Sequence, residues 1–496
     1  MTAKMAQDLA VAAPLLALLL ISLIPLLLKV VRGNREPNPF ATLTYGILAL
    51  VVAAGLTAAL STGVRKAYAF NDAIVFDGIA VWMSYLVYLI AGVSLMLGYD
   101  HVLTRGRQFS EWVFLLLSSV IGMIIVLMSN DLIVTFIGIE TMSLCLYILV
   151  AMSKEEVLSK EASFKYFVLG SFASAIFLYG IAFLYGTAGS TAFPIIAEQA
   201  SQLLGTNRLF MVGMAMVVLG FAFKVSLFPL HSWTPDVYQG APTPLTAFMS
   251  TAVKGATFVA FLRFFHAPAL ADSTALLNVV TWIAALTMLV GNVAAVLQDN
   301  FKRMLAYSSI AHSGYAFVGL VAAGFGDNYA GASTALLFYL FSYSLMTLGS
   351  FALIALFEKN ENVSVRVQDL KGLASRQPLL AFSLSILMLS LAGIPPTLGF
   401  FGKFYVFAAA IEQDMYWLVF WGVVSSAIGV YYYLRPVVMM YMTEDEPQPI
   451  LELNLMTKWT VVAAAVLIVA FGLFSSPVLR AVQRAVLSPA AVSVNR

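Results

Sequence analysis

The sequence predicts an all-α membrane protein of about fourteen transmembrane helices. Of its 496 residues, 61% are hydrophobic and only 10% are charged, whereas about a quarter of the residues in soluble proteins are charged. Apolar stretches of about 18 residues or more recur from one end of the chain to the other, and each is long enough to cross a bilayer as a helix. In two of these stretches, proline interrupts the apolar length close to a mid-span lysine, and some stretches carry a charged residue near their middle.

The predicted spans are separated by short loops, and no connecting segment is long enough to fold as a soluble domain. The first span has an apolar core of about 20 residues and no small-residue cleavage site, which favours a membrane helix over a signal peptide. The spans lie near residues 9–28, 41–62, 75–98, 111–128, 131–152, 162–187, 209–229 (continuing to about 240), 242–265, 275–297, 302–325, 330–357, 378–413, 416–441 and 457–479.

We interpret the chain as a single integral membrane domain over residues 1–496. Inside it we expect three N-terminal spans, two five-helix repeats related by inversion (spans 4–8 and 9–13), and a C-terminal span. Spans 7 and 12, each the fourth in its repeat, are the interrupted ones, and such a pattern is typical of transporters. The expected parts cover residues 1–105, 106–268, 269–442 and 443–496.

The distribution of basic residues predicts the orientation in the membrane. An even number of spans places both termini on the same side. When loops are assigned alternately to two sides, the side without the termini collects about twice as many Lys and Arg as the other, and cytoplasmic loops are enriched in these residues. We therefore predict that both termini lie outside the cytoplasm, on the periplasmic side.

The two interrupted spans are expected to break at their prolines. The seventh span contains Pro229, and the twelfth contains Pro395 and Pro396. Because proline lacks an amide hydrogen and clashes with the preceding turn, each helix should kink or unwind there. Unwound backbone at membrane depth is tolerated only where it is buried in protein or lines a wet cavity. Proline kinks are common in membrane helices, but each of these lies close to a mid-span lysine, Lys224 or Lys403.

Four ionisable residues lie near the middle of apolar runs: Glu140, Lys224, Lys254 and Lys403. Each costs about 3 kcal/mol or more at that depth, so each needs a partner, a wet cavity or a function. Glu140 is the only carboxylate deep in a predicted span, so at least two of the lysines lack a carboxylate partner. Desolvation favours the neutral form of such a lysine. A lysine that loses and regains its proton, tuned by a movable carboxylate, is a reversible proton carrier.

Other candidates are weaker. Lys165 lies near the start of its span, where its ammonium group can also reach the headgroups. His312, with serines around it, suits a proton relay or a hydrogen-bonded core, and His231 just after Pro229 is a similar case. The single cysteine, Cys145, cannot build an iron–sulfur cluster or a zinc site based on cysteine. We expect no metal or cofactor in this chain.

Three blocks of the sequence resemble the antiporter-like membrane subunits of respiratory complex I. They are Phe-Ala-Phe-Lys-Val-Ser-Leu-Phe-Pro-Leu-His-Ser-Trp-Thr-Pro-Asp-Val-Tyr-Gln-Gly-Ala-Pro-Thr-Pro (221–244), Asp-Asn-Phe-Lys-Arg-Met-Leu-Ala-Tyr-Ser-Ser-Ile-Ala-His-Ser-Gly-Tyr (299–315) and Leu-Ala-Gly-Ile-Pro-Pro-Thr-Leu-Gly-Phe-Phe-Gly-Lys-Phe-Tyr-Val (391–406). The third block looks like the N type of these subunits. The sister M type has glutamate where this chain has Lys403, and the L type carries a long extra lateral helix.

The resemblance implies a proton-translocating membrane subunit of an NADH–quinone oxidoreductase, moving protons outward while quinone is reduced elsewhere in the complex. By the matching motifs, Glu140 resembles the pairing glutamate of the family, Lys224 the broken-helix lysine, Lys254 the central relay lysine and Lys403 the terminal lysine. Lys165 resembles a further lysine of the N type, and the role of His312 remains open.

The resemblance also implies the surroundings of the chain. FMN, iron–sulfur clusters and quinone are expected in the parent complex, together with other membrane and peripheral subunits, including sister antiporter-like subunits. The chain would sit as a multi-pass protein in the lipid bilayer of the bacterial plasma membrane and bind no nucleic acid. One alternative is a subunit of a multisubunit cation/proton antiporter, which shares the fold and the lysines. Another, a haem-carrying electron carrier, needs facing histidines, and only His231 and His312 lie near membrane depth.

Overall fold

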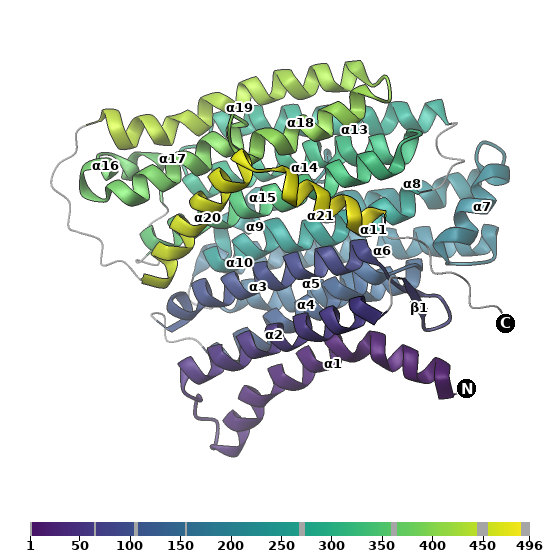
Figure 1. The fold of residues 1–496 in the computed structure, drawn as a ribbon, viewed down its shortest axis with the longest axis horizontal. Helices are drawn as coiled ribbons and strands as arrows, with labels where there is room; N and C mark the ends of the chain where they lie inside the picture. Colours follow the sequence, from purple (N-terminus) through teal and green to yellow (C-terminus); the bar gives the residue numbers. More distant parts are fainter. Residues whose placement is uncertain are drawn as a thin grey trace.

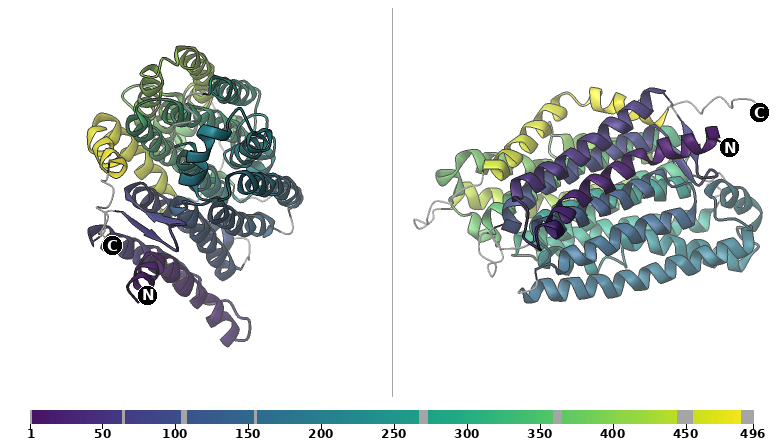
Figure 2. Two further views of the ribbon diagram at one scale, coloured as in Figure 1. Left: turned by 90° about the vertical axis from the view of Figure 1, so that its right-hand side faces the viewer. Right: turned by 90° about the horizontal axis from the view of Figure 1, so that it is seen from below.

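The computed structural model describes residues 2–63, 66–103, 108–153, 156–266, 273–358, 365–443 and 455–487. Long helices run side by side through the whole molecule (Figure 1), and a view along them shows a bundle (Figure 2, left). In the described part, 12 helices are long and apolar enough to cross a membrane. The chain is therefore a multi-pass membrane protein.

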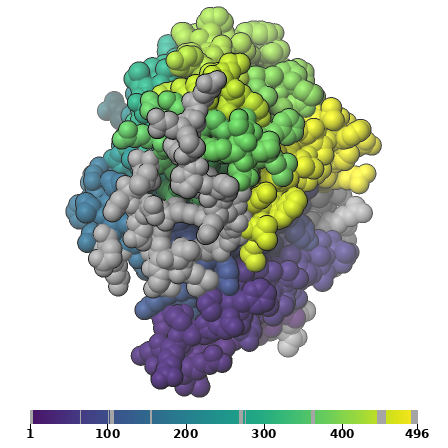
Figure 3. All heavy atoms as spheres, turned by 90° about the vertical axis from the view of Figure 1, so that its left-hand side faces the viewer, coloured from purple at the N-terminus to yellow at the C-terminus, as the bar shows by residue number. Residues whose placement is uncertain are grey.

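The N-terminal part consists of three long helices and a short antiparallel hairpin. Figure 3 shows it as the purple edge of the molecule. The hairpin pairs Ala67 with Phe76 and lies between the second and third helices in the chain. Its elements are α1 (Thr2–Val31), α2 (Pro39–Gly63), β1 (Ala67–Ala69), β2 (Ile74–Phe76) and α3 (Gly78–Leu103).

The middle of the chain contains the first interrupted span. A short amphipathic helix, α7, lies outside the predicted spans, and a π-helical turn, η1, interrupts the eighth span. The elements are α4 (Phe109–Met128), α5 (Leu132–Ala151), α6 (Val157–Ala188), α7 (Phe193–Leu203), α8 (Arg208–Lys224), α9 (Trp233–Gly240), α10 (Thr243–Phe248), η1 (Met249–Val253) and α11 (Lys254–Phe265).

The remaining elements include the second interrupted span and end in a strongly amphipathic helix, α21. They are α13 (Thr274–Val296), α14 (Phe301–Phe325), α15 (Tyr329–Phe357), η2 (Val367–Leu370), α16 (Leu373–Arg376), α17 (Pro378–Ala392), α18 (Leu398–Ile411), α19 (Tyr416–Met442), α20 (Leu455–Leu473) and α21 (Ser476–Val486).

Side-chain caps and small residues fix where helices start and how closely they pack. Asp131 accepts hydrogen bonds from two backbone amides at the start of α5, and Asn300 caps α14 by accepting one from the amide of Arg303. Two helix pairs pack especially closely. A Cβ added at Gly122 of α4 would lie 2.6 Å from a backbone nitrogen of α5, and one at Gly291 of α13 would lie 2.5 Å from a backbone nitrogen of α14. Only glycine allows these approaches.

The most buried spans lie at the centre of the bundle. The span of α10, η1 and α11 is 100% buried over its most apolar segment, and α14 is 94% buried. These helices carry Lys254 and His312. Both side chains are therefore surrounded by other helices rather than by lipid.

The predicted fold class is confirmed, and the differences from the sequence prediction are local. Spans 7 and 12 are discontinuous, as α8–α9 and α17–α18. The hairpin, α7 and the π turn were not predicted from the sequence, and the last predicted span, 457–479, is in fact divided between α20 and α21. The expected domain limits at 105–106 and 268–269 lie outside the described residues.

Candidate functional site

The first helix break holds Lys224 at the end of α8. The chain leaves the helix directly after this residue and becomes helical again at Trp233. The ammonium group is buried and donates a hydrogen bond of 2.7 Å to the hydroxyl of Ser143 on α5. The ring of Tyr147, one turn further along α5, lies 5.9 Å from the Nζ atom. A cation over an aromatic face is stabilised by the ring quadrupole.

Glu140 lies one turn before Ser143, so both side chains share a face of α5. Its Oε1 atom accepts a short hydrogen bond from Ser174 on α6, and the side chain is half-buried. Among the described residues, Glu140 forms no direct ion pair with Lys224. The structure thus brings the two groups to the same helix, but each is bonded to a serine and not to the other.

Lys254 begins α11, directly after the π turn. Its ammonium group donates to three acceptors on α14: the carbonyl of Ser309 at 2.8 Å, the hydroxyl of Ser309 at 2.6 Å and the hydroxyl of Ser313 at 2.9 Å. All three of its protons therefore have partners, and none of the partners is charged. Turns of π-helix occur frequently at functional sites.

His312 lies on α14 between two tyrosines. Its Nδ1 atom is 2.6 Å from the hydroxyl of Tyr339 on α15, and its Nε2 atom is 3.0 Å from the hydroxyl of Tyr433 on α19. The Tyr433 hydroxyl also shares a short hydrogen bond with Ser308. A neutral imidazole can donate at one nitrogen and accept at the other, so the group can pass a proton between the two tyrosines.

The second helix break surrounds Lys403 with backbone oxygens. This residue lies on α18, and its Nζ atom donates to the carbonyls of Leu391 and Ala392, both 3.1 Å away in the last turn of α17. A third bond, of 2.9 Å, goes to the hydroxyl of Ser426 on α19. The ring of Tyr315 lies 4.7 Å from Nζ. The C-terminal end of a helix carries partial negative charge, which favours a cation there.

Helix α14 connects these groups because it packs against both α11 and α18. Ser309 and Ser313 face Lys254, whereas His312 faces α15 and α19. Helix α19 carries the Tyr433 partner of His312 and the Ser426 partner of Lys403. Polar groups thus extend from the centre of the bundle to the second helix break.

Between Lys224 and Lys254 the described residues form no continuous chain of hydrogen bonds. The ring of Tyr238 lies 5.9 Å from the Nζ atom of Lys254, and its buried hydroxyl has no hydrogen-bond partner in the described part. The hydroxyl of Tyr147, next to Lys224, is also buried and has no hydrogen-bond partner in the described part. Buried polar groups without a protein partner are where internal water is expected.

Of the weaker candidates, Lys165 and His231 form no hydrogen bond to these residues in the described part of the chain. Lys165 forms ion pairs of 2.7 Å with Glu161 and Asp236, and Asp236 also pairs with Arg303. Glu161, Asp236 and Arg303 line a cavity of about 170 Å³. His231 is half-buried in the first break, where it stacks on a phenylalanine at 5.7 Å, and its Nδ1 atom has no partner in the described part.

The prolines lie in the two breaks as expected, and both breaks contain a cis peptide bond. Pro229 follows Phe228 in cis, and Pro396 follows Pro395 in cis. The amide of Phe228 donates to the hydroxyl of Thr287 on α13, which satisfies part of the unwound backbone.

Sequence reasoning missed the hydroxyl partners of the lysines and of His312. Ser309 and Ser313 are one turn apart in sequence, as are Ser308 and His312, so the pattern on α14 was visible. Tyr433, in contrast, is one of three consecutive tyrosines, and only the packing of α19 distinguishes it from its neighbours. Within the described residues, no group of three His, Cys, Asp or Glu side chains is arranged to hold a metal ion.

The chain is similar to known proteins over almost its whole length. Residues 129–429 match the family model described as NADH:quinone oxidoreductase/Mrp antiporter, TM. A curated relative, NADH-quinone oxidoreductase subunit N of Bdellovibrio bacteriovorus, is 50% identical over 97% of this chain and 99% of its own length. A chain in respiratory complex I from Thermus thermophilus is 33% identical with a TM-score of 0.79, covering 95% of this chain and 99% of that one. A chain of the Mrp complex from Dietzia has the same fold, with a TM-score of 0.84 at 22% identity, covering 98% of this chain and 97% of that one.

Proposed function

We propose, from the premise that the chain belongs to the NADH-quinone oxidoreductase subunit N family of antiporter-like complex I subunits, that its buried lysines carry protons across the membrane. The observation that supports this is common to all three lysines. Lys224, Lys254 and Lys403 are 4%, 2% and 6% exposed, and each is bonded only to neutral hydroxyls or carbonyls. A buried lysine without a carboxylate is poised to release its proton.

The relay that we propose passes from Lys224 through Lys254 and His312 to Lys403. Moving one proton outward against 100 mV costs about 2.3 kcal/mol, apart from the cost of placing charge in an apolar medium. A sequence of buried acceptors divides this barrier into shorter transfers. The serines and tyrosines that touch Lys254, His312 and Lys403 supply hydroxyls for these transfers. Water beside Tyr147 and Tyr238 would close the gap between the first two lysines.

Glu140 would set the protonation of Lys224. Both side chains reach the same face of α5, through Ser143 in the case of Lys224. When Glu140 is ionised and turns away from Ser174, it stabilises the ammonium form of Lys224; when it returns to Ser174, that stabilisation falls. Redox energy released elsewhere in the complex would act on this equilibrium. The chain itself carries no electrons in this scheme.

The two inverted repeats would be the framework of two half-channels. What supports them is the position of the breaks and of the closest contacts. The breaks α8–α9 and α17–α18 occupy the fourth place in each five-span unit, and the glycine-mediated contacts α4–α5 and α13–α14 occupy the first two places. Lys224 and Lys254 would belong to the first half-channel and Lys403 to the second.

The family implies the setting of the protein. We propose that it lies in the bacterial plasma membrane with both termini on the periplasmic side. Its partners would be the other membrane and peripheral subunits of complex I, including sister antiporter-like subunits. FMN, iron–sulfur clusters and quinone would be held by the parent complex, outside this chain.

Replacing Lys254 by Met tests the proposal. Methionine is similar in length and neutral, and the serines that bond Lys254 keep other partners, since Ser313 donates to the Ser309 carbonyl and Tyr343 donates to the Ser309 hydroxyl. We expect NADH-driven proton uptake into inverted membrane vesicles to fall by about tenfold, as for a barrier raised by about 1.4 kcal/mol. The amount of assembled complex should be unchanged.

Lys458→Met is the control, because Lys458 is a half-buried lysine of α20 that lies outside the relay. It should leave proton uptake at the wild-type rate. Wild-type uptake in Lys254→Met would refute the relay, and loss of the assembled complex in Lys254→Met but not in Lys458→Met would show that Lys254 is needed for folding.

A further inference from the structure

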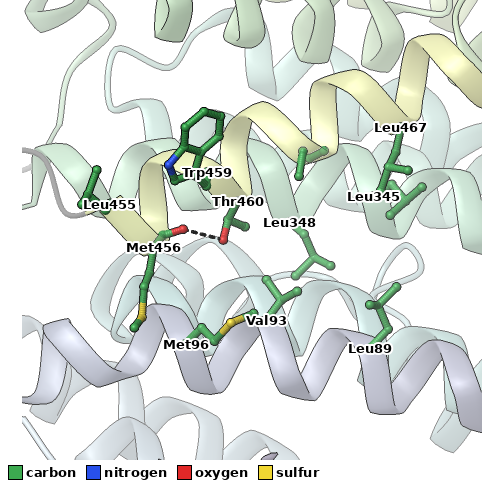
Figure 4. Close-up of a pocket in the computed structure, with 12 residues that line it drawn as sticks. Leu89, Val93, Met96, Leu345, Leu348, Leu455, Met456, Trp459, Thr460 and Leu467 are labelled. Carbon is green, nitrogen blue, oxygen red and sulfur yellow. Dashed lines mark hydrogen bonds between the residues drawn. The ribbon is translucent and has the colours of Figure 1, made fainter. Parts of the chain in front are cut away.

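A groove with apolar walls lies between α3, α15 and α20, outside the proposed relay. Its volume is about 510 Å³. Figure 4 shows Val93 and Met96 of α3 facing α20 across the groove, with Leu348 of α15 behind them. No charged residue lines it. One of the few polar groups, the hydroxyl of Thr460, is already bonded to the carbonyl of Met456 at 2.9 Å.

The groove lies within membrane-spanning helices and extends through about one leaflet. Its lining residues on α20 run from Leu455 to Leu467, a rise of about 18 Å at 1.5 Å per residue. Half of the hydrocarbon core of a bilayer is about 15 Å thick. Trp459, which is 59% exposed, lies near one end of the groove, and tryptophan is enriched at the membrane–water interface. The groove therefore runs from the interface toward the middle of the membrane.

We propose that this groove binds one acyl chain of a bilayer phospholipid. Water is a poor occupant because the walls offer almost no free hydrogen-bonding group. An empty groove would deprive its walls of dispersion contacts. A helix of a partner protein is too large, since 18 Å of helix about 10 Å wide occupies roughly 1,400 Å³. A single flexible chain fits the volume, and Met96 and Met456 can adapt their side chains to it.

The bound acyl chain would contact helices that are far apart in the sequence. Helix α3 belongs to the N-terminal part and α20 to the C-terminal part, and the groove is the space that their packing leaves open. A lipid chain in this space contacts both helices and α15 at once. We therefore expect a lipid that exchanges more slowly than those on the outer faces of the bundle.

The test uses a phosphatidylethanolamine with a photoreactive diazirine in its acyl chain. The whole complex is equilibrated with this lipid in vesicles, washed with mild detergent, irradiated and digested. For wild type, we expect wash-resistant labelling on residues 89–96 and 455–467, and much less on the exposed face of α6. Ala463→Phe, which fills the groove, should lower this labelling by about tenfold, equivalent to a loss of about 1.4 kcal/mol of binding.

Val466→Phe is the matched control, since Val466 is 60% exposed on the same helix and does not line the groove. It should be labelled like wild type. Leu89→Trp fills the groove from the opposite wall and is a second test if Ala463→Phe does not assemble. Equal labelling of the groove and of α6 after the wash in wild type would overturn the proposal. So would strong labelling by a photoreactive quinone that excludes the phospholipid.

Discussion

At the scale of single residues, neutral acceptors distinguish the proposed relay from the structural ion pairs of the same molecule. Lys302 is also buried, but it bonds the carboxylate of Glu358 at 2.8 Å and a backbone carbonyl at 2.6 Å. A lysine held by a carboxylate keeps its proton, whereas Lys254, held by two serines, can release it at lower cost. The difference lies in the partner of each lysine, because both are buried.

The hydroxyl of Tyr433 is expected to be required for proton transfer past His312. This hydroxyl is hydrogen-bonded both to His312 and to Ser308. Tyr433→Phe keeps the ring and the packing and removes this bridge. We expect a several-fold slower proton uptake in vesicles, because a missing relay group costs about 1 kcal/mol or more, with normal assembly of the complex.

Tyr431→Phe provides the comparison for that variant. Tyr431 is two residues away on α19 and 64% exposed, whereas Tyr433 is 1% exposed. Its replacement should leave proton uptake unchanged. If both variants pump at the wild-type rate, protons do not pass by way of Tyr433.

At the scale of helices, each break places a helix end beside a lysine. Lys224 is the last residue of α8 itself, and Lys403 reaches the last carbonyls of α17 from α18. An unbroken helix would use those carbonyls for its own hydrogen bonds. At Lys403, the break is therefore what makes neutral acceptors available to a buried ammonium group.

Lys403→Glu is expected to be no better tolerated than Lys403→Ala. A carboxylate at this position would face two carbonyl oxygens and the negative end of α17, each of which opposes its charge. Lys403→Arg should behave differently. Its guanidinium can still donate to the carbonyls, but it does not release its proton at accessible pH.

Proton uptake and thermal stability of the purified complex together distinguish the roles of Lys403. We expect Lys403→Arg to preserve the melting temperature and to abolish proton uptake. Lys403→Glu should lose both. Full uptake in Lys403→Arg would show that this residue only holds the break together and carries no proton.

At the scale of the whole molecule, the sequence predicts what depends on local pattern. Apolar length predicted the spans, and Pro229 and Pro395–Pro396 predicted the two breaks, because both effects act within one helix. Contacts between residues far apart in the chain could not be predicted from the sequence. The bond from Lys224 to Ser143 crosses 81 residues of sequence, and the contact of Ser308 with Tyr433 crosses 125. No local pattern distinguishes those partners from other serines and tyrosines of the chain.

One long-range ion pair ties the N-terminal part to the centre of the bundle. Asp77, just before α3, accepts two hydrogen bonds of 2.8 and 2.7 Å from Arg263 in the last turn of α11. Arg263 also donates to the carbonyl of Leu127 on α4 at 3.2 Å. Both side chains are nearly buried. Because removing one partner leaves a buried charge unpaired, breaking such a pair costs about 3–5 kcal/mol.

Asp77→Asn is therefore expected to lower the melting temperature of the purified complex. Asparagine can still accept the hydrogen bond from the Ala80 amide that caps α3, so mainly the ion pair is lost. Burial by itself raises the pKa of Asp77, but the Arg263 guanidinium holds this pKa below its ordinary value. The stabilisation is thus fully present above the unfolded pKa of about 3.9 and disappears only as pH falls through the lower folded pKa.

The difference in melting temperature between wild type and Asp77→Asn should therefore be constant from neutral pH down to about pH 5. Asp72→Asn is the control. Asp72 lies in the turn of the same hairpin with a φ of 66°, a conformation that asparagine also adopts, and its carboxylate takes no part in the Asp77–Arg263 pair. It should melt like wild type. If the melting temperatures of wild type and Asp77→Asn became equal near neutral pH, Asp77 would already be protonated there. Arg263 would then not be its ion-pair partner.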